Sequence, residues 1–428
     1  MKQPIGMNEL RTCALVCSVL LVPLLAAAQR EEVARPTGWI TTWAASPEPA
    51  DPDPSQPVLN LQDQTVRERV RISAGGSKIR LRLSNEYGSS PVLVGSVTVA
   101  VSVDPASVKL GSIKAVTFGQ RNSITIPAGA PALSDPVAFP VAYGTEITVS
   151  LYFPKRVTTP TWHALALKRT VVSPPGDHTH QETIQGGTEA SSLVALSAVL
   201  LPAQASERVV VAFGDSIVDG DGSTIDADRN WPSDFSRRLG KTPGGSKWAV
   251  VNEGIAGNRL LADGPIASLG ASALARFDRD ALSLPGVTHI VLLEGINDIG
   301  FPGAKLGELS LADPGDVRKP EDLIGAYLQL IARAHARGVK LIGSTLTPCE
   351  GVDILGYYSK AKEVTRQAVN QWIRTSGAFD GVIDFDLVLK DPDRPSRLLP
   401  RYSSQDHLHP NDAGYQAMAE AIELALFR

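Results

Sequence analysis

Four short stretches of the sequence carry side chains that could perform acyl transfer. A serine hydroxyl is a weak nucleophile until a neighbouring base removes its proton, and a carboxylate commonly orients that base. A serine, a histidine and an aspartate therefore indicate nucleophilic catalysis if folding brings them together. In chain order the stretches are GDS (214–216), NEGIAGN (252–258), GIND (295–298) and QDHLHPND (405–412).

The residue types in these stretches divide into a reacting group and a set of hydrogen-bond donors. Asp406 and His409 are three residues apart, so a turn can place both side chains on one side, with the carboxylate on Nδ1–H and Nε2 facing Ser216. The backbone N–H groups of Ser216 and Gly257 and the amide of Asn297 could converge on a tetrahedral oxyanion. We expect the Ser216 hydroxyl to be exposed in a polar loop.

From residue 208 onward, apolar strand-like runs alternate with helical patterns. The run VVVAF (209–213) is continuously apolar, as in a strand buried on both faces. Such alternation gives a parallel sheet with helices on both faces, and ligands bind beyond the carboxyl ends of its strands. The expected strands are 209–213, 248–252, 288–294, 339–344 and 381–385, and the clearest helices are 321–338, 365–377 and 412–427.

The N-terminal half predicts an all-β domain. Residues 66–73 and 78–85 alternate strictly between apolar and polar, and the Ala-Gly-Gly-Ser segment 74–77 between them indicates a hairpin. Further short runs separated by Pro- and Gly-bearing turns are typical of a β-sandwich or jelly roll. The predicted organisation is a leader at 1–28, a β-sandwich domain at 31–200, a linker at 201–207 and an α/β domain at 208–428.

Taken together and in this order, the four stretches resemble the sequence blocks of the SGNH (GDSL) hydrolases, over roughly 208–428. The resemblance implies a flavodoxin-like three-layer α/β/α fold and serine esterase chemistry without a cofactor or a metal. The N-terminal half and the opening TWAASP (42–47) look like a secreted bacterial branch with an ancillary β-domain.

The resemblance also implies a role for each site residue. Ser216 corresponds to the nucleophile, His409 to the general base and Asp406 to the group that orients it. The implied oxyanion hole consists of Ser216, Gly257 and Asn297.

The first 28 residues predict a cleaved secretory leader. A positive start with Lys2 and Arg11 precedes an apolar run and the Ala-Ala-Ala segment 26–28, a stretch too short for a membrane span. We therefore expect an exported protein, periplasmic or extracellular, with no integral membrane segment after cleavage. Cleavage would also remove two of the three cysteines and leave only Cys349, so no intrachain disulfide is expected.

The charge of the chain argues against a nucleic-acid partner. Its net charge is −4, and loss of the leader, which carries Lys2, Arg11 and Glu9, changes it to −5. A nucleic-acid-binding protein usually presents a basic face instead.

Several motifs have plainer interpretations. A lone Gly-Asp-Ser is usually a turn, and only the other three stretches favour catalysis. The segment Asp219–Gly222 suggests calcium, but the EF-hand glycine is missing and position 230 is asparagine, so a loop is favoured. The spacing of His407 from Asp406 is wrong for a catalytic pair. His163, His289 and His335 are expected in packing or surface positions.

The expected function is an exported serine ester hydrolase acting on an ester substrate. Short acyl groups, such as acetyl on a saccharide, are favoured because no long apolar lid segment is evident. A lipase, lysophospholipase or arylesterase activity remains open. The rival class is a non-catalytic polysaccharide-binding protein.

Overall fold

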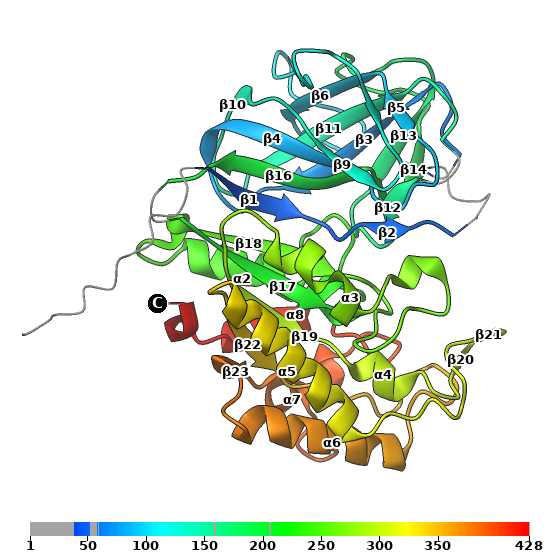
Figure 1. The fold of residues 1–428 in the computed structure, drawn as a ribbon, viewed down its shortest axis with the longest axis vertical. Coiled ribbons are helices and arrows are strands. Elements are labelled where there is room, and N and C mark those ends of the chain that lie inside the picture. The colour runs from blue at the N-terminus through cyan, green and yellow to red at the C-terminus, as the bar shows by residue number, and fades with distance from the viewer. Residues whose placement is uncertain (1–37, 52–57, 59, 158–159, 205–206, 428) are drawn as a thin grey trace, which may run out of the picture. The chain divides into compact units, whose positions relative to one another are not determined.

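The computed structural model describes residues 38–51, 58, 60–157, 160–204 and 207–427. These residues belong to one compact unit that spans 37–428 (Figure 1). The predicted leader at 1–28 lies outside the described residues, as do residues 205 and 206 of the predicted linker. The domain boundaries therefore stay predictions. Among the described residues, none of the helices is both long enough and apolar enough to cross a membrane.

The N-terminal region of the described chain contains sixteen strands, and they pair only in antiparallel fashion. They are β1 Trp39–Ala44, β2 Glu48–Pro49, β3 Gln64–Arg71, β4 Gly76–Asn85, β5 Val92–Val94, β6 Ser96–Val101, β7 Lys114–Ala115, β8 Ile124–Ile126, β9 Ala130–Leu133, β10 Val137–Val141, β11 Glu146–Phe153, β12 Thr161–His163, β13 Thr170–Pro175, β14 Thr188–Ala190, β15 Leu193–Val194 and β16 Leu196–Pro202.

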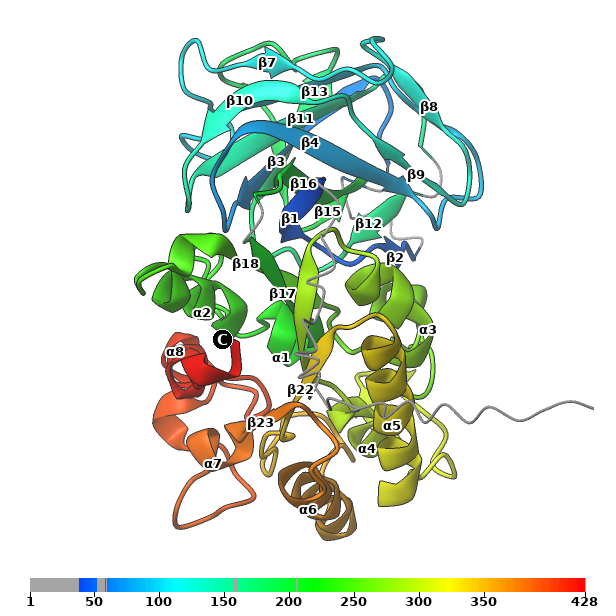
Figure 2. The same cartoon turned by 60° about the vertical axis from the view of Figure 1, so that its left-hand side comes forward.

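Two larger sheets form the body of this region, in the orders β1-β16-β4-β10 and β14-β13-β3-β11-β6-β7. Apolar side chains of β4 and β11, such as Leu81 and Val149, are fully buried in the core. The smaller β15-β12-β2 sheet lies at the end of the sandwich near the α/β region (Figures 1 and 2). The predicted β-sandwich is confirmed.

The predicted hairpin between 66–73 and 78–85 is wrong. Strands β3 and β4 belong to different sheets, so the chain crosses from one layer to the other between them. Two-residue hairpin turns need a positive φ, which neither Gly75 nor Gly76 adopts. The crossover backbone is instead held by β1, because the Ser73 N–H donates to Thr42 O at 2.9 Å and the Ala74 N–H donates to Thr42 Oγ1 at 2.8 Å.

The C-terminal region is built on a five-stranded parallel sheet in the order β18-β17-β19-β22-β23. Numbered along the chain this order is 2-1-3-4-5, the flavodoxin-like order, so the predicted fold class is confirmed. The five strands are β17 Arg208–Gly214, β18 Trp248–Gly254, β19 Val287–Leu293, β22 Lys340–Ser344 and β23 Gly381–Ile383. The short strands β20 Lys305–Leu306 and β21 Leu309–Ser310 form a separate hairpin.

Helices cover both faces of this sheet, with α3 and α5 on one side and α2 and α8 on the other (Figure 2). The Pro-Glu-Asp start of α5 places acidic residues in the first turn, and the Lys319 N–H donates to Asp322 Oδ2 at 2.8 Å. The α-helices are α1 Ser216–Asp219, α2 Trp231–Gly240, α3 Ala273–Phe277, α4 Ile296–Gly300, α5 Pro320–Ala336, α6 Lys360–Thr375, α7 Phe385–Leu389 and α8 Asp412–Ala421.

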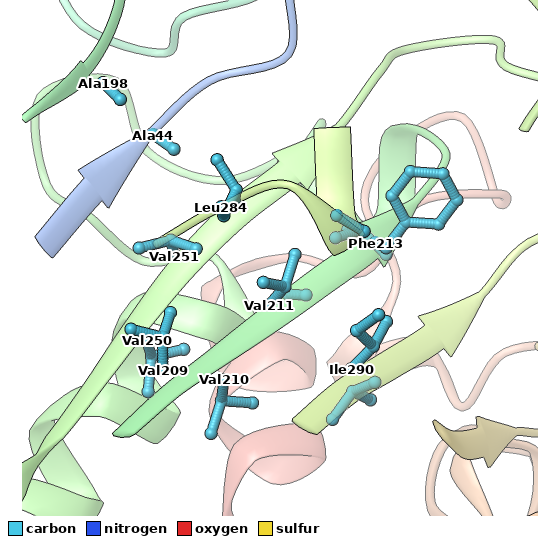
Figure 3. Packing of buried hydrophobic residues seen from close by; sticks show 14 of the residues in the cluster. Ala44, Ala198, Val209, Val210, Val211, Phe213, Val250, Val251, Leu284 and Ile290 are labelled. Atoms are coloured by element: carbon cyan, nitrogen blue, oxygen red, sulfur yellow. The ribbon is translucent and has the colours of Figure 1, made fainter. Parts of the chain in front are cut away.

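The sandwich and the α/β region share a packed boundary. Strand β1 lies against β18, and Figure 3 shows Ala44 beside Val251 and Leu284. Polar contacts continue this boundary, since the Thr41 N–H donates to Pro285 O at 2.9 Å and Ser46 Oγ donates to Glu253 Oε2 at 2.6 Å.

One buried cation holds the carboxyl ends of the central strands. The Arg276 guanidinium, at the end of α3, donates to Gly214 O at 2.7 Å and to Glu253 O at 2.9 Å, the last residue of β17 and the next-to-last residue of β18. It also donates to Asn258 Oδ1 at 2.8 Å and to Ser46 Oγ of the sandwich at 3.0 Å. Its side chain is completely buried.

Carboxylates and an aromatic ring surround the same guanidinium. Asp280 Oδ2 lies 3.4 Å from Nη1, Glu294 Oε2 lies 3.9 Å from Nη2, and the Phe213 ring centre is 4.1 Å from Cζ. Removing one partner of a buried ion pair is costly because the remaining charge is left in a low-dielectric environment.

We expect Arg276→Met, which keeps an unbranched apolar stem but removes the guanidinium, to lower the free energy of unfolding by about 3–5 kcal/mol. The matched control is Arg394→Met. Arg394 pairs with Glu350 at 2.6 Å but is half exposed, and its loss should cost no more than about 1 kcal/mol. Urea denaturation of both variants measures the difference, and equal losses would contradict the role of Arg276.

Candidate active site

Ser216 lies at the first position of helix α1, directly beyond the carboxyl end of β17. Asp215 caps this helix, since its Oδ1 accepts the Ile217 N–H at 2.9 Å. A side chain at Gly214 would collide with Leu293 O, because a Cβ there would lie 1.9 Å from that oxygen. The expected exposure of Ser216 is wrong: the residue is only 5% exposed, since the chain enters the helix without an intervening loop.

The structure brings Ser216, His409 and Asp406 into one hydrogen-bonded row. His409 Nε2 is 2.8 Å from Ser216 Oγ, and His409 Nδ1 is 2.5 Å from Asp406 Oδ2. A carboxylate can only accept, so Nδ1 carries the proton, and the neutral imidazole can accept from the serine hydroxyl at Nε2. This is the arrangement needed for proton transfer from the serine.

Backbone and hydroxyl donors hold the Asp406 carboxylate in place. Its Oδ1 accepts from the N–H groups of Leu408 and His409 at 2.9 and 3.0 Å, and from Ser404 Oγ at 2.5 Å. The last helix begins at Asp412 behind Asn411, where the sequence pattern predicts its start. The turn at 404–410 therefore sets the direction of the imidazole.

The charges around His409 favour its protonated form and so raise the pKa of its imidazole. Burial would lower the pKa of His409, but the hydrogen bond to Asp406 and the charges of Asp221 and Asp406 outweigh it and raise the pKa above its ordinary value. For Asp406, burial raises the pKa, yet the hydrogen bond and the charge of His409 prevail and lower it. Asp221 Oδ2 lies 3.7 Å from His409 Nε2.

His407 does not belong to this row. Its side chain is exposed, its φ is +60°, and its Nδ1 lies 3.4 Å from Ser403 Oγ. The prediction that His409, and not His407, faces the Asp406 carboxylate therefore agrees with the geometry.

The predicted oxyanion residues are Ser216 at the start of α1, Asn297 at the start of α4 and Gly257 in the loop after β18. Asn297 Nδ2 donates to Asn258 O at 2.8 Å, which ties the Asn297 side chain to the residue after Gly257. The Ile255 N–H donates to Gly214 O at 3.0 Å, which ties the same loop to the end of β17. Gly257 has a φ of +72°, and no partner is found for its N–H among the described residues. That donor remains available for a ligand.

Tyr357 orients the Asn297 amide and was not singled out in the sequence. Its hydroxyl donates to Asn297 Oδ1 at 2.8 Å, so Nδ2 must be the donating end of the amide. Tyr357 lies sixty residues from Asn297, in a loop after β22, and no local motif marks it. Only the packing of that loop on α4 could reveal the contact.

Asp298 and Asp215 hold the backbone around the site. The Asp298 carboxylate accepts the N–H groups of Leu260 and Leu261 at 2.6 and 2.9 Å. Burial raises the pKa of both aspartates. In the described part of the chain, no group of three or more His, Cys, Asp or Glu side chains is arranged to hold a metal ion.

Comparison with known proteins places this site in a family. Residues 212–417 match the model of the GDSL-like lipase/acylhydrolase family. The C-terminal region belongs to this family. The resemblance noted from the sequence blocks is thereby confirmed, and the protein is an acylhydrolase, an enzyme that cleaves esters.

Two solved structures illustrate what the chain is similar to. A GDSL-like lipase from Bacteroides thetaiotaomicron VPI-5482 is 18% identical, with 51% of this chain and 88% of that chain covered and a TM-score of 0.36. A carbohydrate acetylesterase family member from Sinorhizobium meliloti is 15% identical, with 51% and 97% covered and a TM-score of 0.40. A search of curated proteins finds no match.

For this GDSL-family site we expect Asp406→Asn to lower the pKa of His409, because the substitution removes the negative charge that favours the imidazolium. NMR titration of the imidazole measures the change. His407→Ala is the control and should leave the titration of His409 where it is. An unchanged His409 titration in Asp406→Asn would mean that Asp406 does not stabilise the imidazolium.

Proposed function

We propose that the protein hydrolyses esters through an acyl-enzyme formed on Ser216, with His409 as general base and Asp406 as the residue that orients it. The observation that carries the proposal is the row of two short hydrogen bonds, 2.8 Å from His409 Nε2 to Ser216 Oγ and 2.5 Å from His409 Nδ1 to Asp406 Oδ2. A serine at this distance from an oriented imidazole can lose its proton as it attacks.

In the first half of the reaction, Ser216 Oγ attacks the ester carbonyl carbon while His409 Nε2 takes the hydroxyl proton. The carbonyl oxygen becomes an oxyanion that accepts hydrogen bonds from the Ser216 and Gly257 N–H groups and from Asn297 Nδ2. The intermediate collapses, the C–O bond to the alcohol breaks, and His409 returns the proton to the departing alkoxide. Asp406 stabilises the transient imidazolium.

In the second half, water replaces the alcohol. His409 removes a proton from the water as its oxygen attacks the acyl carbon, and the same donors hold the second oxyanion. Collapse releases the carboxylic acid and restores the Ser216 hydroxyl with the proton from His409. No cofactor enters this scheme.

We propose short acyl groups on a saccharide as the substrate class. The side chains next to His409 are polar and reach solvent: Asp221 and Asp406 are about two-fifths exposed, and Ser404 donates to Asp406. A polar alcohol portion, such as a sugar, can form hydrogen bonds with such a surface.

Lipid esters are the second candidate, supported by apolar side chains on neighbouring loops. Leu306 is 56% exposed and Leu355 is 77% exposed, and the Lys305 N–H donates to Leu355 O at 2.8 Å, which brings their two loops together. These loops follow β19 and β22, so they lie at the edge of the sheet from which Ser216 projects.

We expect Ser216→Ala to lower kcat on nitrophenyl acetate by a factor of roughly 10⁴–10⁶. The fold should persist, because among the described residues the only side-chain hydrogen bond that is lost is the one to His409. A serine-directed fluorophosphonate should label the wild-type protein and not the variant. His407→Ala is the matched control and should remain active.

Two results would contradict this assignment. Turnover near the wild-type rate in Ser216→Ala would show that Ser216 is not the nucleophile. A wild-type protein that is neither labelled nor active would instead favour the non-catalytic polysaccharide-binding alternative.

The acyl group can be identified with a series of nitrophenyl esters from acetyl to octanoyl. For a short-acyl enzyme, kcat/KM should be highest for acetyl and fall with chain length. Burial of the chain on an apolar surface would instead raise kcat/KM by roughly three- to fourfold per methylene. Acetate release from an acetylated polysaccharide then tests the saccharide portion.

A further inference from the structure

A buried histidine of the sandwich contacts the helix that begins with Ser216. His163, the last residue of β12, is 6% exposed. Its Nε2 lies 3.3 Å from Asp219 Oδ1 in the α/β region. Its Nδ1 lies 2.9 Å from Glu48 Oε1 and 3.1 Å from Ser46 O. Both ring nitrogens therefore face acceptors, which only a doubly protonated imidazolium can satisfy.

Asp219 is the last residue of α1, one turn after Ser216, and it is 5% exposed. Its backbone carbonyl accepts from Asn252 Nδ2 at 3.1 Å and from Asn230 Nδ2 at 3.2 Å. Strand β18 ends against its backbone, because a Cβ on Gly254 would lie 2.2 Å from the Asp219 nitrogen. Residues of the α/β region therefore hold the main chain of α1 in place.

The Asn252 side chain connects the end of α1 to the segment that leads to the oxyanion loop. Its Nδ2 donates to Val218 O at 2.8 Å and to Asp219 O at 3.1 Å, and its Oδ1 accepts the Gly254 N–H at 2.9 Å. Gly254 is followed three residues later by Gly257, whose N–H is a proposed oxyanion donor. Asp219 therefore contacts His163 of the sandwich with its carboxylate, belongs to the helix of the nucleophile, and is joined through its backbone to the strand end that precedes the oxyanion loop.

We infer that His163 is a positioning residue of the esterase site: by holding Asp219, the sandwich fixes the relative placement of Ser216 and Gly257. The inference rests on the proposed roles of those two residues. It makes the N-terminal sandwich part of the catalytic unit, with the active-site helix anchored to it by a buried ion pair. The sequence placed His163 among packing or surface residues, and the structure buries it.

The electrostatics agree with this geometry. Burial alone would lower the pKa of His163, but the charges of Asp219 and Glu48 outweigh it and raise the pKa well above its ordinary value. Glu48 comes from β2 and Asp219 from α1, and Glu253 at the end of β18 and Asp221 after α1 also interact with this group of charges. An imidazolium is the only cation that contacts the Asp219 carboxylate among the described ion pairs.

The test compares His163→Ala with His163→Gln. The alanine removes the donor to Asp219, and we expect kcat per folded molecule to fall by roughly 10–10²-fold with little change in KM, as for a displaced reacting group. The glutamine amide can reach the position of Nε2 and donate to Asp219, so it should recover most of the lost kcat. A residue that served only the fold would change the melting temperature without this pattern.

Asp219→Asn provides a second route, since His163→Ala leaves two buried carboxylates without a cation and can lower stability severely. The asparagine leaves His163 and Glu48 as a balanced pair, so the protein should fold. It lacks the charge that pairs with the His163 imidazolium, so its contact with His163 is weaker, and kcat should fall again. In His163→Ala/Asp219→Asn the losses should not multiply, because both substitutions act through one contact.

Tyr143→Phe is the matched control at the same boundary. Tyr143 Oη lies 3.0 Å from Ser236 Oγ on α2, so the substitution removes a contact between the sandwich and the α/β region without touching α1. Its kcat should equal that of the wild type. Wild-type kcat in folded His163→Ala, or multiplying losses in the double variant, would overturn the inference. Activity in Ser216→Ala would instead refute the proposed function.

Discussion

The Arg276 guanidinium is the contact on which the arrangement of the site depends. The ends of β17 and β18, the Asn258 side chain and Ser46 of the sandwich all offer acceptors to one buried cation. Five guanidinium N–H donors in a rigid plane suit this position, since a single side chain can satisfy several backbone carbonyls that no strand pairing would reach. Helix α1, which begins at Ser216, and the loop that carries Gly257 follow these strand ends.

Burying charge at this boundary costs free energy, and the structure offsets that cost by pairing. Burial raises the pKa of Glu253 and of Glu294, both close to Arg276. A second cation, His163, faces Glu48 and Asp219. Apolar packing of β1 on β18 alone would allow many relative placements of the two regions. These paired charges favour a single placement. The sandwich and the α/β region accordingly meet along specific contacts.

The site itself combines a rigid nucleophile with a base carried on a turn. Ser216 starts a helix at the end of a buried strand, and its position follows from the sheet. His409 comes from the opposite end of the domain sequence, and its direction follows from the hydrogen bonds that Asp406 accepts from the backbone of the same turn. A small change in that turn would separate the imidazole from the serine without altering the sheet.

The sequence by itself determined the parallel sheet, the antiparallel region and the four blocks of the site. Continuous apolar runs such as 209–213 and the i, i+3 spacing of Asp406 and His409 are local patterns, and local patterns can be recognised from the sequence alone. Tertiary structure decided the rest. The segments 66–73 and 78–85 belong to different sheets, and Thr42, far away in the chain, accepts the hydrogen bonds of the backbone N–H groups between them. The contacts of His163 with Asp219 and of Tyr357 with Asn297 join residues more than fifty positions apart, and only the packing of whole layers brings such pairs together.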